Sequence, residues 1–235
     1  RVIWAHDGVG GDVFDLFFKA LTPEQRASIR VVAGDGARWI DSCVHEWCPN
    51  AERVLDGFHI VSWMTDCLDR VRKRLWNQAR RAKDKTAAEA MKGLKYAVLR
   101  NPGDLAERQS TALATLAGVD PKGQLYRSWQ LKELLRTLLH QPAGQAEGEL
   151  KRWINWASHS RIPEIVELAR KIRRRRPDIL RTIELGYSNA RLGAFNNRIK
   201  VTVRMAYGFR RVTNLIALVM PRCSGLDIRL PQPAI

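Results

Sequence analysis

The sequence predicts an α/β fold in which helices cover a mixed sheet that is at least partly parallel, interrupted by an all-helical insertion. Segments typical of strands and of helices alternate over residues 2–55, which is the element order of α/β layers. Residues 100–180 instead contain only helical segments, separated by prolines such as Pro102 and Pro163. A chain of 235 residues with 45% hydrophobic content can bury a substantial core.

The N-terminal segment predicts a short strand over residues 2–4, followed by two helices. Residues 12–21 place apolar side chains at helical spacing, with Asp12 as the expected N-cap. Thr22 followed by Pro23 is typical of the start of a second, short helix. A strand followed by helices in this order favours an arrangement in which helices pack on a sheet.

Two further strands are predicted, and each ends at an aspartate. The segment SIRVVAGDG, residues 28–36, is β-branched, apolar and ended by glycines, which predicts a buried strand with Asp35 at its C-terminal end. A helix follows over residues 37–47, and a brief strand over residues 53–55 then ends at Asp56.

From residue 58 to about residue 95 the chain is predicted to be helical and strongly basic. One face of this helix is polar or cationic, and the opposite face is apolar. The polar face consists of Arg70, Lys73, Arg74, Asn77 and Arg81. A solvated helix face is the alternative, but the charge of the whole chain favours contact with nucleic-acid phosphates.

The balance of charge indicates a polyanionic partner. Lys and Arg number 40 against 24 Asp and Glu, which gives a formal charge of +16 and an isoelectric point of about 10.4. Such a charge repels itself in a compact protein and is tolerated best when the partner is a polyanion such as nucleic acid. A generically basic surface is the alternative. No apolar run approaches the roughly 20 residues that span a bilayer, and the start RVIWAHDG lacks a signal-peptide pattern, so we expect an intracellular protein with no membrane partner.

Carboxylates at strand ends are the candidate catalytic groups. A carboxylate at the C-terminal end of a buried strand lies at the rim of an α/β sheet, where ligands and metal ions usually bind. Asp35 meets this description, and a turn aspartate is the alternative. Asp56 repeats the geometry, with His59 three residues later at the start of a helix. An N-cap aspartate beside a packed histidine is the alternative there.

The segment YSNARLGAFNNRIKVTVRMAYGF, residues 187–209, predicts a helix that contains an unexpected glycine. Apolar residues recur every three or four positions from Leu192 to Val203, which is the period of one helix face. Gly193 in the interior of this helix costs about 1 kcal/mol relative to alanine. Close packing against a neighbouring helix is one explanation for it.

These motifs together resemble the DDE transposases of the bacterial ISL insertion-sequence family, which are relatives of the Mutator-like transposases. The resemblance runs over nearly the whole chain. It rests on Asp35, the DGFH element at residues 56–59, the basic helix after it, the helical insertion, and SNARLGAFNNRIK with AYGF beyond. The most specific part is the C-terminal signature, which comprises Ser188, Asn189, Arg191, Asn196, Ile199, Lys200, Arg204, Ala206, Tyr207, Gly208 and Phe209.

The resemblance implies a ribonuclease H-like core interrupted by a helical domain. Residues 1–95 and 181–235 would form the core, and residues 96–180 the insertion. It also implies double-stranded DNA as the partner, both as transposon ends and as target, and cleavage and strand transfer assisted by Mg²⁺ or Mn²⁺. Two metals held by three acidic side chains can stabilise both the attacking and the leaving oxygens of such a displacement.

Carried over to this chain, the family pattern makes Asp35 the second metal-binding acid, and makes Asp56 and His59 a support near the site. Gly193 occupies the position of the third acid, where the family usually has glutamate. The first acid of the family lies upstream of residues 2–4, so we expect a catalytic-core fragment that retains one of three metal acids and is inactive or severely impaired. The polar residues expected beside the DNA backbone are Asn189, Arg191, Asn196, Lys200 and Arg204.

A non-catalytic or degenerate DNA-binding protein derived from a transposase is the alternative function, because the basic faces are intact while a metal ligand is missing. An RNA-binding helical protein is a third reading of the charge. A DNA partner implies a cytoplasmic, nucleoid-associated bacterial protein. Whether the chain forms a homodimer stays open.

Overall fold

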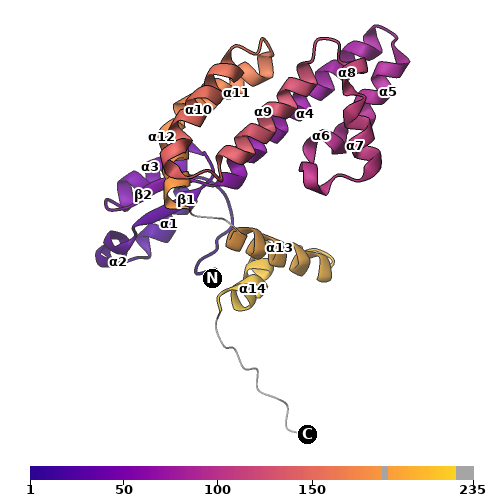
Figure 1. Ribbon diagram of the computed structural model, residues 1–235. Coiled ribbons are helices and arrows are strands. Elements are labelled where there is room, and N and C mark those ends of the chain that lie inside the picture. Colours follow the sequence, from indigo (N-terminus) through magenta and orange to yellow (C-terminus); the bar gives the residue numbers. More distant parts are fainter. Residues whose placement is uncertain (187–189, 226–235) are drawn as a thin grey trace. The chain divides into compact units, whose positions relative to one another are not determined.

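The computed structural model describes the backbone of residues 1–186 and 190–225, with all of their side chains except those of residues 117 and 190–196. The chain is mostly helical and contains one small sheet. It divides into two compact units, Arg1–Arg53 with Ser188–Ile235 and Val54–Tyr187. Figure 1 shows the order of the elements along the chain.

The first unit begins with short helices that precede and separate the two strands of the sheet. Its elements in chain order are α1 (Gly11–Lys19), α2 (Pro23–Ser28), β1 (Val31–Gly34), α3 (Arg38–Trp47) and β2 (Glu52–Leu55), the last of which runs into the second unit. Two later helices, α13 (Ala190–Met205) and α14 (Val212–Cys223), belong to the same unit and pack against each other. The helix predicted within residues 187–209 is therefore confirmed over 190–205.

Local sequence signals start α2 where the sequence predicts. The Thr22 hydroxyl accepts a hydrogen bond from the backbone N–H of Gln25 (3.2 Å), and the Gln25 side chain accepts one from the Thr22 N–H (2.8 Å). Pro23 takes the first helical position, where no N–H is needed. The capping box stabilises the start of α2, which extends to Ser28. Strand β1 therefore starts at Val31 and not at residue 28, where the predicted strand segment begins.

The sheet is smaller than the sequence predicts. Strands β1 and β2 form a parallel pair and are the only strands among the residues that the structure describes. The prediction of a strand over residues 2–4 is wrong, because these residues are irregular and the Val2 N–H donates to the carbonyl oxygen of Cys223 (2.8 Å) at the end of α14. A strand needs the edge of another strand to pair with, and no described strand pairs with residues 2–4. The predicted α/β fold is therefore confirmed only in part, because the protein is mostly helical and has one small parallel sheet.

The second unit is helical around one long helix. Its elements are α4 (Gly57–Arg81), α5 (Lys85–Gly93), α6 (Lys95–Leu99), a 3₁₀ turn (Pro102–Asp104), α7 (Glu107–Ala114), α8 (Leu116–Val119), α9 (Gln124–Leu138), α10 (Ala143–Ser158), α11 (Pro163–Arg174) and α12 (Arg176–Leu185). Helix α4 packs against α5, α9 and α11, and α4 and α9 lie side by side in Figure 1. Its apolar face, which includes Met64, Leu68 and Val71, is fully buried in the core. Burial of each such side chain contributes about 1.5–3 kcal/mol. None of the helices in the described part of the chain is both long and apolar enough to cross a membrane.

A buried threonine links α12 to β2 within the second unit. The Thr182 hydroxyl oxygen accepts a hydrogen bond from the Leu55 N–H (3.1 Å). Its proton lies within reach of two carbonyl oxygens, those of Leu55 and Asp178, both at 2.8 Å. One hydroxyl therefore satisfies the backbone of Leu55, the last residue of β2, in a buried position where water cannot replace it.

Replacing Thr182 with valine keeps the shape of the side chain but removes this hydroxyl. We expect the free energy of unfolding to fall by about 1–3 kcal/mol, because the buried Leu55 N–H is left without a partner. Thr65→Val is the matched control, since the Thr65 hydroxyl only bonds the Val61 carbonyl of its own helix (2.9 Å). Urea denaturation followed by circular dichroism measures both variants, and equal losses in the two would contradict the proposed link.

A half-buried ion pair joins α4 to α11. The Arg74 guanidinium donates to both carboxylate oxygens of Glu164 (2.7 and 3.1 Å) and to the side chain of Gln124 (2.8 Å). Burial by itself raises the pKa of Glu164, but the hydrogen bonds and the charge of Arg74 outweigh it, so the pKa lies below its ordinary value of 4.5. The pair is bidentate, which is the strongest geometry for an arginine and a carboxylate.

The lowered pKa predicts acid sensitivity of the second unit. The stabilisation from Glu164 is complete above its unfolded pKa of 4.5 and is lost as the pH falls through the lower folded value. Glu164→Gln should therefore be less stable than the wild type at pH 7 and lose less stability between pH 5 and pH 3. Glu167→Gln, which breaks an exposed pair with Arg70 (3.0 Å), is the control and should change stability by at most about 1 kcal/mol. Parallel pH profiles of wild type and Glu164→Gln in denaturant titrations would show that the pair is unimportant.

Candidate nucleic-acid interface

Asp35 lies at the end of β1, as the sequence predicts. Its carboxylate accepts a hydrogen bond from the backbone N–H of Ala37 (2.9 Å), the residue that precedes α3. This is the geometry of an Asx turn, in which an aspartate side chain accepts a hydrogen bond from the backbone N–H two residues later. The side chain is half-buried. The structure thus places Asp35 at the rim of the sheet and also gives it a local structural contact.

An arginine that sequence reasoning missed holds the end of β1. The Arg53 guanidinium, from β2, donates to the carbonyl oxygens of Val32 (3.3 Å), Gly34 (3.5 Å) and Asp35. It also donates to the carboxylate of Asp41 on α3 (3.1 Å). The signal available in the sequence was an arginine within a short predicted strand, because a cation that packs against a sheet needs acceptors nearby. The contacts fix the backbone on which the Asp35 side chain stands.

Asp56 and His59 lie close together in the second unit. The Asp56 carboxylate accepts a hydrogen bond from the Phe58 N–H (2.8 Å), which makes Asp56 the N-cap of α4. The His59 Nε2 lies 4.0 Å from an Asp56 carboxylate oxygen. Asp56 is only 8% exposed. The capping geometry considered as the alternative is therefore present, and a further role for the two residues stays a prediction.

The described residues do not assemble a metal centre. Among the side chains that the structure describes, no three His, Cys, Asp or Glu residues lie close enough to hold a metal ion. Burial, together with Asp15, raises the pKa of Cys43 to about 11, so this thiol stays protonated and is a poor ligand at neutral pH. Gly193 lies in α13, but its surroundings fall outside the described side chains. Asp35 is thus the one predicted metal ligand that the structure positions.

The basic face predicted on α4 is largely ion-paired. Arg74 pairs with Glu164 and Arg70 with Glu167, both on α11, and Lys73 pairs with Asp69 (2.8 Å) one turn away. The residues of this face that remain exposed without such an ion pair are Asn77 and Arg81. Since a neutralised cation attracts phosphate weakly, this face offers less to a polyanion than its sequence indicates.

The cations of α13 and α14 have a different environment. Residues 185–226 contain seven Arg or Lys and neither Asp nor Glu. Lys200 and Arg204 are exposed on α13 and make no ion pair within the described part of the chain. Of the other residues predicted beside DNA, Asn189 lies outside the described residues, and the side chains of Arg191 and Asn196 do as well. An exposed cationic surface without acids is the electrostatic footprint of nucleic-acid binding.

Comparison with known proteins identifies the class of the chain. Residues 1–219 match a family model described as a transposase. The chain belongs to the ISL3 family of DDE insertion-sequence transposases, which confirms the family that its motifs resemble.

Curated relatives support the same family. The chain is 39% identical over 250 residues to the transposase for insertion sequence element IS1557 of Mycobacterium tuberculosis, an alignment that covers 98% of this chain and 56% of the relative. It is 28% identical over 212 residues to the transposase for insertion sequence element IS1001 of Bordetella parapertussis, with 89% and 51% covered. The chain therefore spans about half the length of the curated relatives that it matches. No solved structure matches it significantly.

The contrast between paired and unpaired cations predicts different effects on DNA binding. Replacing Lys200 and Arg204 with alanine should lower the affinity for any duplex and reduce the slope of log K against log salt by about two, roughly one for each lost phosphate contact. The matched variant, Arg70→Ala with Lys73→Ala, removes two cations that have acidic partners and should change the slope by less than one. Fluorescence anisotropy of a labelled duplex across a salt series measures both. A larger change of the salt slope in the Arg70 and Lys73 variant than in the Lys200 and Arg204 variant would indicate that α4, and not α13, makes the phosphate contacts.

Proposed function

We propose that this chain is part of the catalytic core of an insertion-sequence transposase, inactive by itself, with double-stranded DNA bound along α13 and α14. The single observation that carries the proposal is the acid-free cationic segment, residues 185–226, in a chain of the ISL3 family. Phosphate contacts from arginine, lysine and asparagine position a protein on DNA without reading its sequence. The DNA would be the ends of the element and its target, and the protein would then act at the bacterial nucleoid.

The reaction class proposed for the family is cleavage of DNA phosphodiesters followed by strand transfer. In this proposal residues 1–95 and 181–235 form a ribonuclease H-like core, and residues 96–180 form a helical insertion. The parallel pair β1 and β2 would be part of the sheet of that core, and Asp35 at the end of β1 would be a metal-binding acid. Arg53 supports this assignment, because it fixes the backbone that carries the carboxylate.

The described residues do not fit a two-metal magnesium centre. Such a centre needs several carboxylates that converge on hydrated ions, and the described side chains contain no group of three candidate ligands. Asp35 supplies one carboxylate, and its hydrogen bond from Ala37 (2.9 Å) already uses part of its acceptor capacity. We therefore assign no step of the reaction to a metal ion.

This chain alone should bind DNA without processing it. In a nicking and strand-transfer assay with Mg²⁺ or Mn²⁺, we expect product at background level, because one carboxylate cannot hold two hydrated metals. Binding of the same duplex, followed by anisotropy, shows that the protein is folded and competent. Product above background that disappears in the Asp35→Ala variant would show that the count of metal ligands is wrong.

Gly193→Glu tests the proposed position of the third acid. The variant should be at least as stable as the wild type, because glutamate has a higher helix propensity than glycine by roughly 0.5–1 kcal/mol. In a full-length version of the protein, which supplies the upstream residues, it should also gain product in the same assay if Gly193 marks the missing ligand. Gly193→Gln is the matched control without charge. Equal activity of the two variants argues against a metal ligand at this position.

A further inference from the structure

The turn that joins α13 to α14 holds an aromatic residue in a strained backbone conformation. Helix α13 ends at Met205, and Tyr207 follows with a φ of 53°, in the left-handed region. The Tyr207 N–H donates to the carbonyl oxygen of Arg204 (3.1 Å), and the Gly208 N–H donates to that of Val203 (3.0 Å). These two hydrogen bonds form the Schellman motif, whose left-handed position is usually occupied by glycine. In this turn the glycine comes one residue later.

Packing within the described part of the chain does not compensate for this strain. The Tyr207 side chain is 100% exposed, so it buries no apolar surface that would stabilise the fold. A bulky residue is rare at positive φ, and glycine at this position would relieve the strain. The tyrosine therefore costs stability in the free protein, and a contact with a ligand is the physical reason for a ring at this position.

The backbone motif alone does not explain the ring. Among the described residues, Lys83 and Arg161 are the other non-glycine residues with a positive φ. Lys83 ends α4 in the same motif, since its N–H donates to the carbonyl oxygen of Arg80 (3.1 Å) and the next N–H donates to that of Ala79 (3.0 Å). Water solvates the charged side chains at these two positions well, but it solvates an aromatic ring poorly. The exposed ring of Tyr207 is thus the feature that needs a partner.

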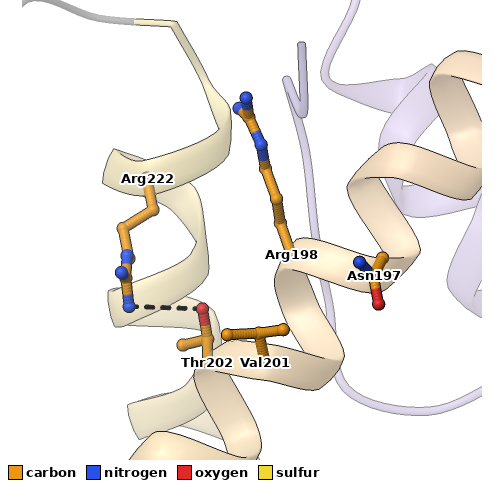
Figure 2. Close-up of a pocket in the computed structure, with 5 residues that line it drawn as sticks. All are labelled: Asn197, Arg198, Val201, Thr202 and Arg222. Carbon is orange, nitrogen blue, oxygen red and sulfur yellow. Dashed lines mark hydrogen bonds between the residues drawn. The ribbon is translucent and has the colours of Figure 1, made fainter.

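The two helices that carry this turn are joined to each other. Helices α13 and α14 pack together, and Figure 2 shows one of their polar contacts, in which Arg222 Nη1 donates to Thr202 Oγ1 (3.3 Å). Thr202 is only 3% exposed, so this hydrogen bond lies inside the helix pair. The turn over residues 206–211 is therefore closed at its base, and its exposed ring stands at a defined place on the pair.

Cations precede and follow the ring along the chain. Arg204 lies in the last turn of α13, and Arg210 and Arg211 lead into α14. All three are exposed and make no ion pair with any residue that the structure describes. Residues 185–226 contain no acid that could neutralise them. An exposed aromatic ring among cations is the combination that binds unpaired bases, and the charge favours nucleic acid over an apolar protein partner.

We propose that the Tyr207 ring stacks on an unpaired base of the bound DNA. The inference rests on the proposed function and names a contact to a base, in addition to the phosphate contacts proposed above. Bases inside a paired duplex are stacked on both faces, whereas an unpaired base has a face free for an aromatic side chain. Such stacking tolerates any sequence, because every base has a π-face. Tyr207 thus gives the chain a preference for DNA that contains unpaired bases.

Two labelled DNAs that share one duplex test the proposal in the full chain. One carries a single-stranded overhang, and the other is fully paired. By fluorescence anisotropy, Tyr207→Gly and Tyr207→Leu should weaken binding to the overhang DNA roughly tenfold and to the paired DNA less than about twofold, whereas Tyr207→Trp keeps the wild-type preference. The salt slope should not change, because no phosphate contact is removed. Equal losses for both DNAs overturn the proposal.

Thermal stability separates this role from a structural one. Tyr207→Gly should raise the melting temperature by about 2 °C, because glycine adopts the left-handed conformation without strain. Lys83→Gly is the matched control, since it relieves the same strain at the end of α4. It should raise the melting temperature to a similar degree and leave the preference for the overhang unchanged. A Tyr207→Gly variant that melts below the wild type shows that the ring supports the fold, and overturns the proposal.

Photocrosslinking identifies the contact directly. Iodouracil placed in the overhang forms a covalent bond with a stacked aromatic ring under ultraviolet light, and mass spectrometry locates the modified residue. A crosslink at Tyr207 supports the proposal. Crosslinks only at other residues overturn it and leave the proposed function standing, and so does a dimer that Tyr207→Leu dissociates without any change in DNA binding. If the wild type binds neither DNA, the proposed function and this inference both fail.

Discussion

A two-stranded sheet leaves the outer backbone groups of both strands without a strand partner, and buried groups of this kind must find partners elsewhere. In this protein, side chains provide hydrogen-bond partners for some of these backbone groups. The Arg53 guanidinium bonds the carbonyl oxygens at the end of β1, and the Thr182 hydroxyl bonds the backbone of Leu55 in β2. The two aspartates that follow these strands, Asp35 and Asp56, therefore stand on backbone that side-chain contacts hold. These side-chain contacts thus help to hold the backbone that carries the two carboxylates.

Ion pairing divides the cations of the chain into two groups with different uses. Acids are fewer than cations by 16, so many Lys and Arg residues cannot have a carboxylate of their own. Arg70 and Arg74 of α4 have partners on α11 and stabilise the packing of the second unit. The cations of α13 and α14 have no acid within their segment. Electrostatic attraction for DNA is therefore expected mainly where the cations are not already paired with acids that stabilise the fold.

Local signals in the sequence predict the features that depend on local contacts. The capping box at Thr22 and the N-cap at Asp56 lie where the sequence indicates, and so does the helix over residues 190–205. The extent of the sheet could not be predicted, because strand pairing depends on residues distant in the chain. For the same reason helical spacing on α4 could not reveal Glu164, which lies 90 residues from its partner Arg74. The role of Arg53 was missed because most of its acceptors are backbone carbonyls, which every sequence has. The roles of Asp35 and Gly193 stay predictions.

The absence of acids between residues 185 and 226 also has a thermodynamic consequence. Seven like charges within that segment repel one another in the free protein, and this repulsion opposes the close approach of α13 and α14. A polyanion that binds only the folded form removes the repulsion and raises the apparent melting temperature. The same charges therefore affect both the pairing of the two helices and the proposed binding of DNA, and under that proposal the pair would be most rigid when DNA is bound.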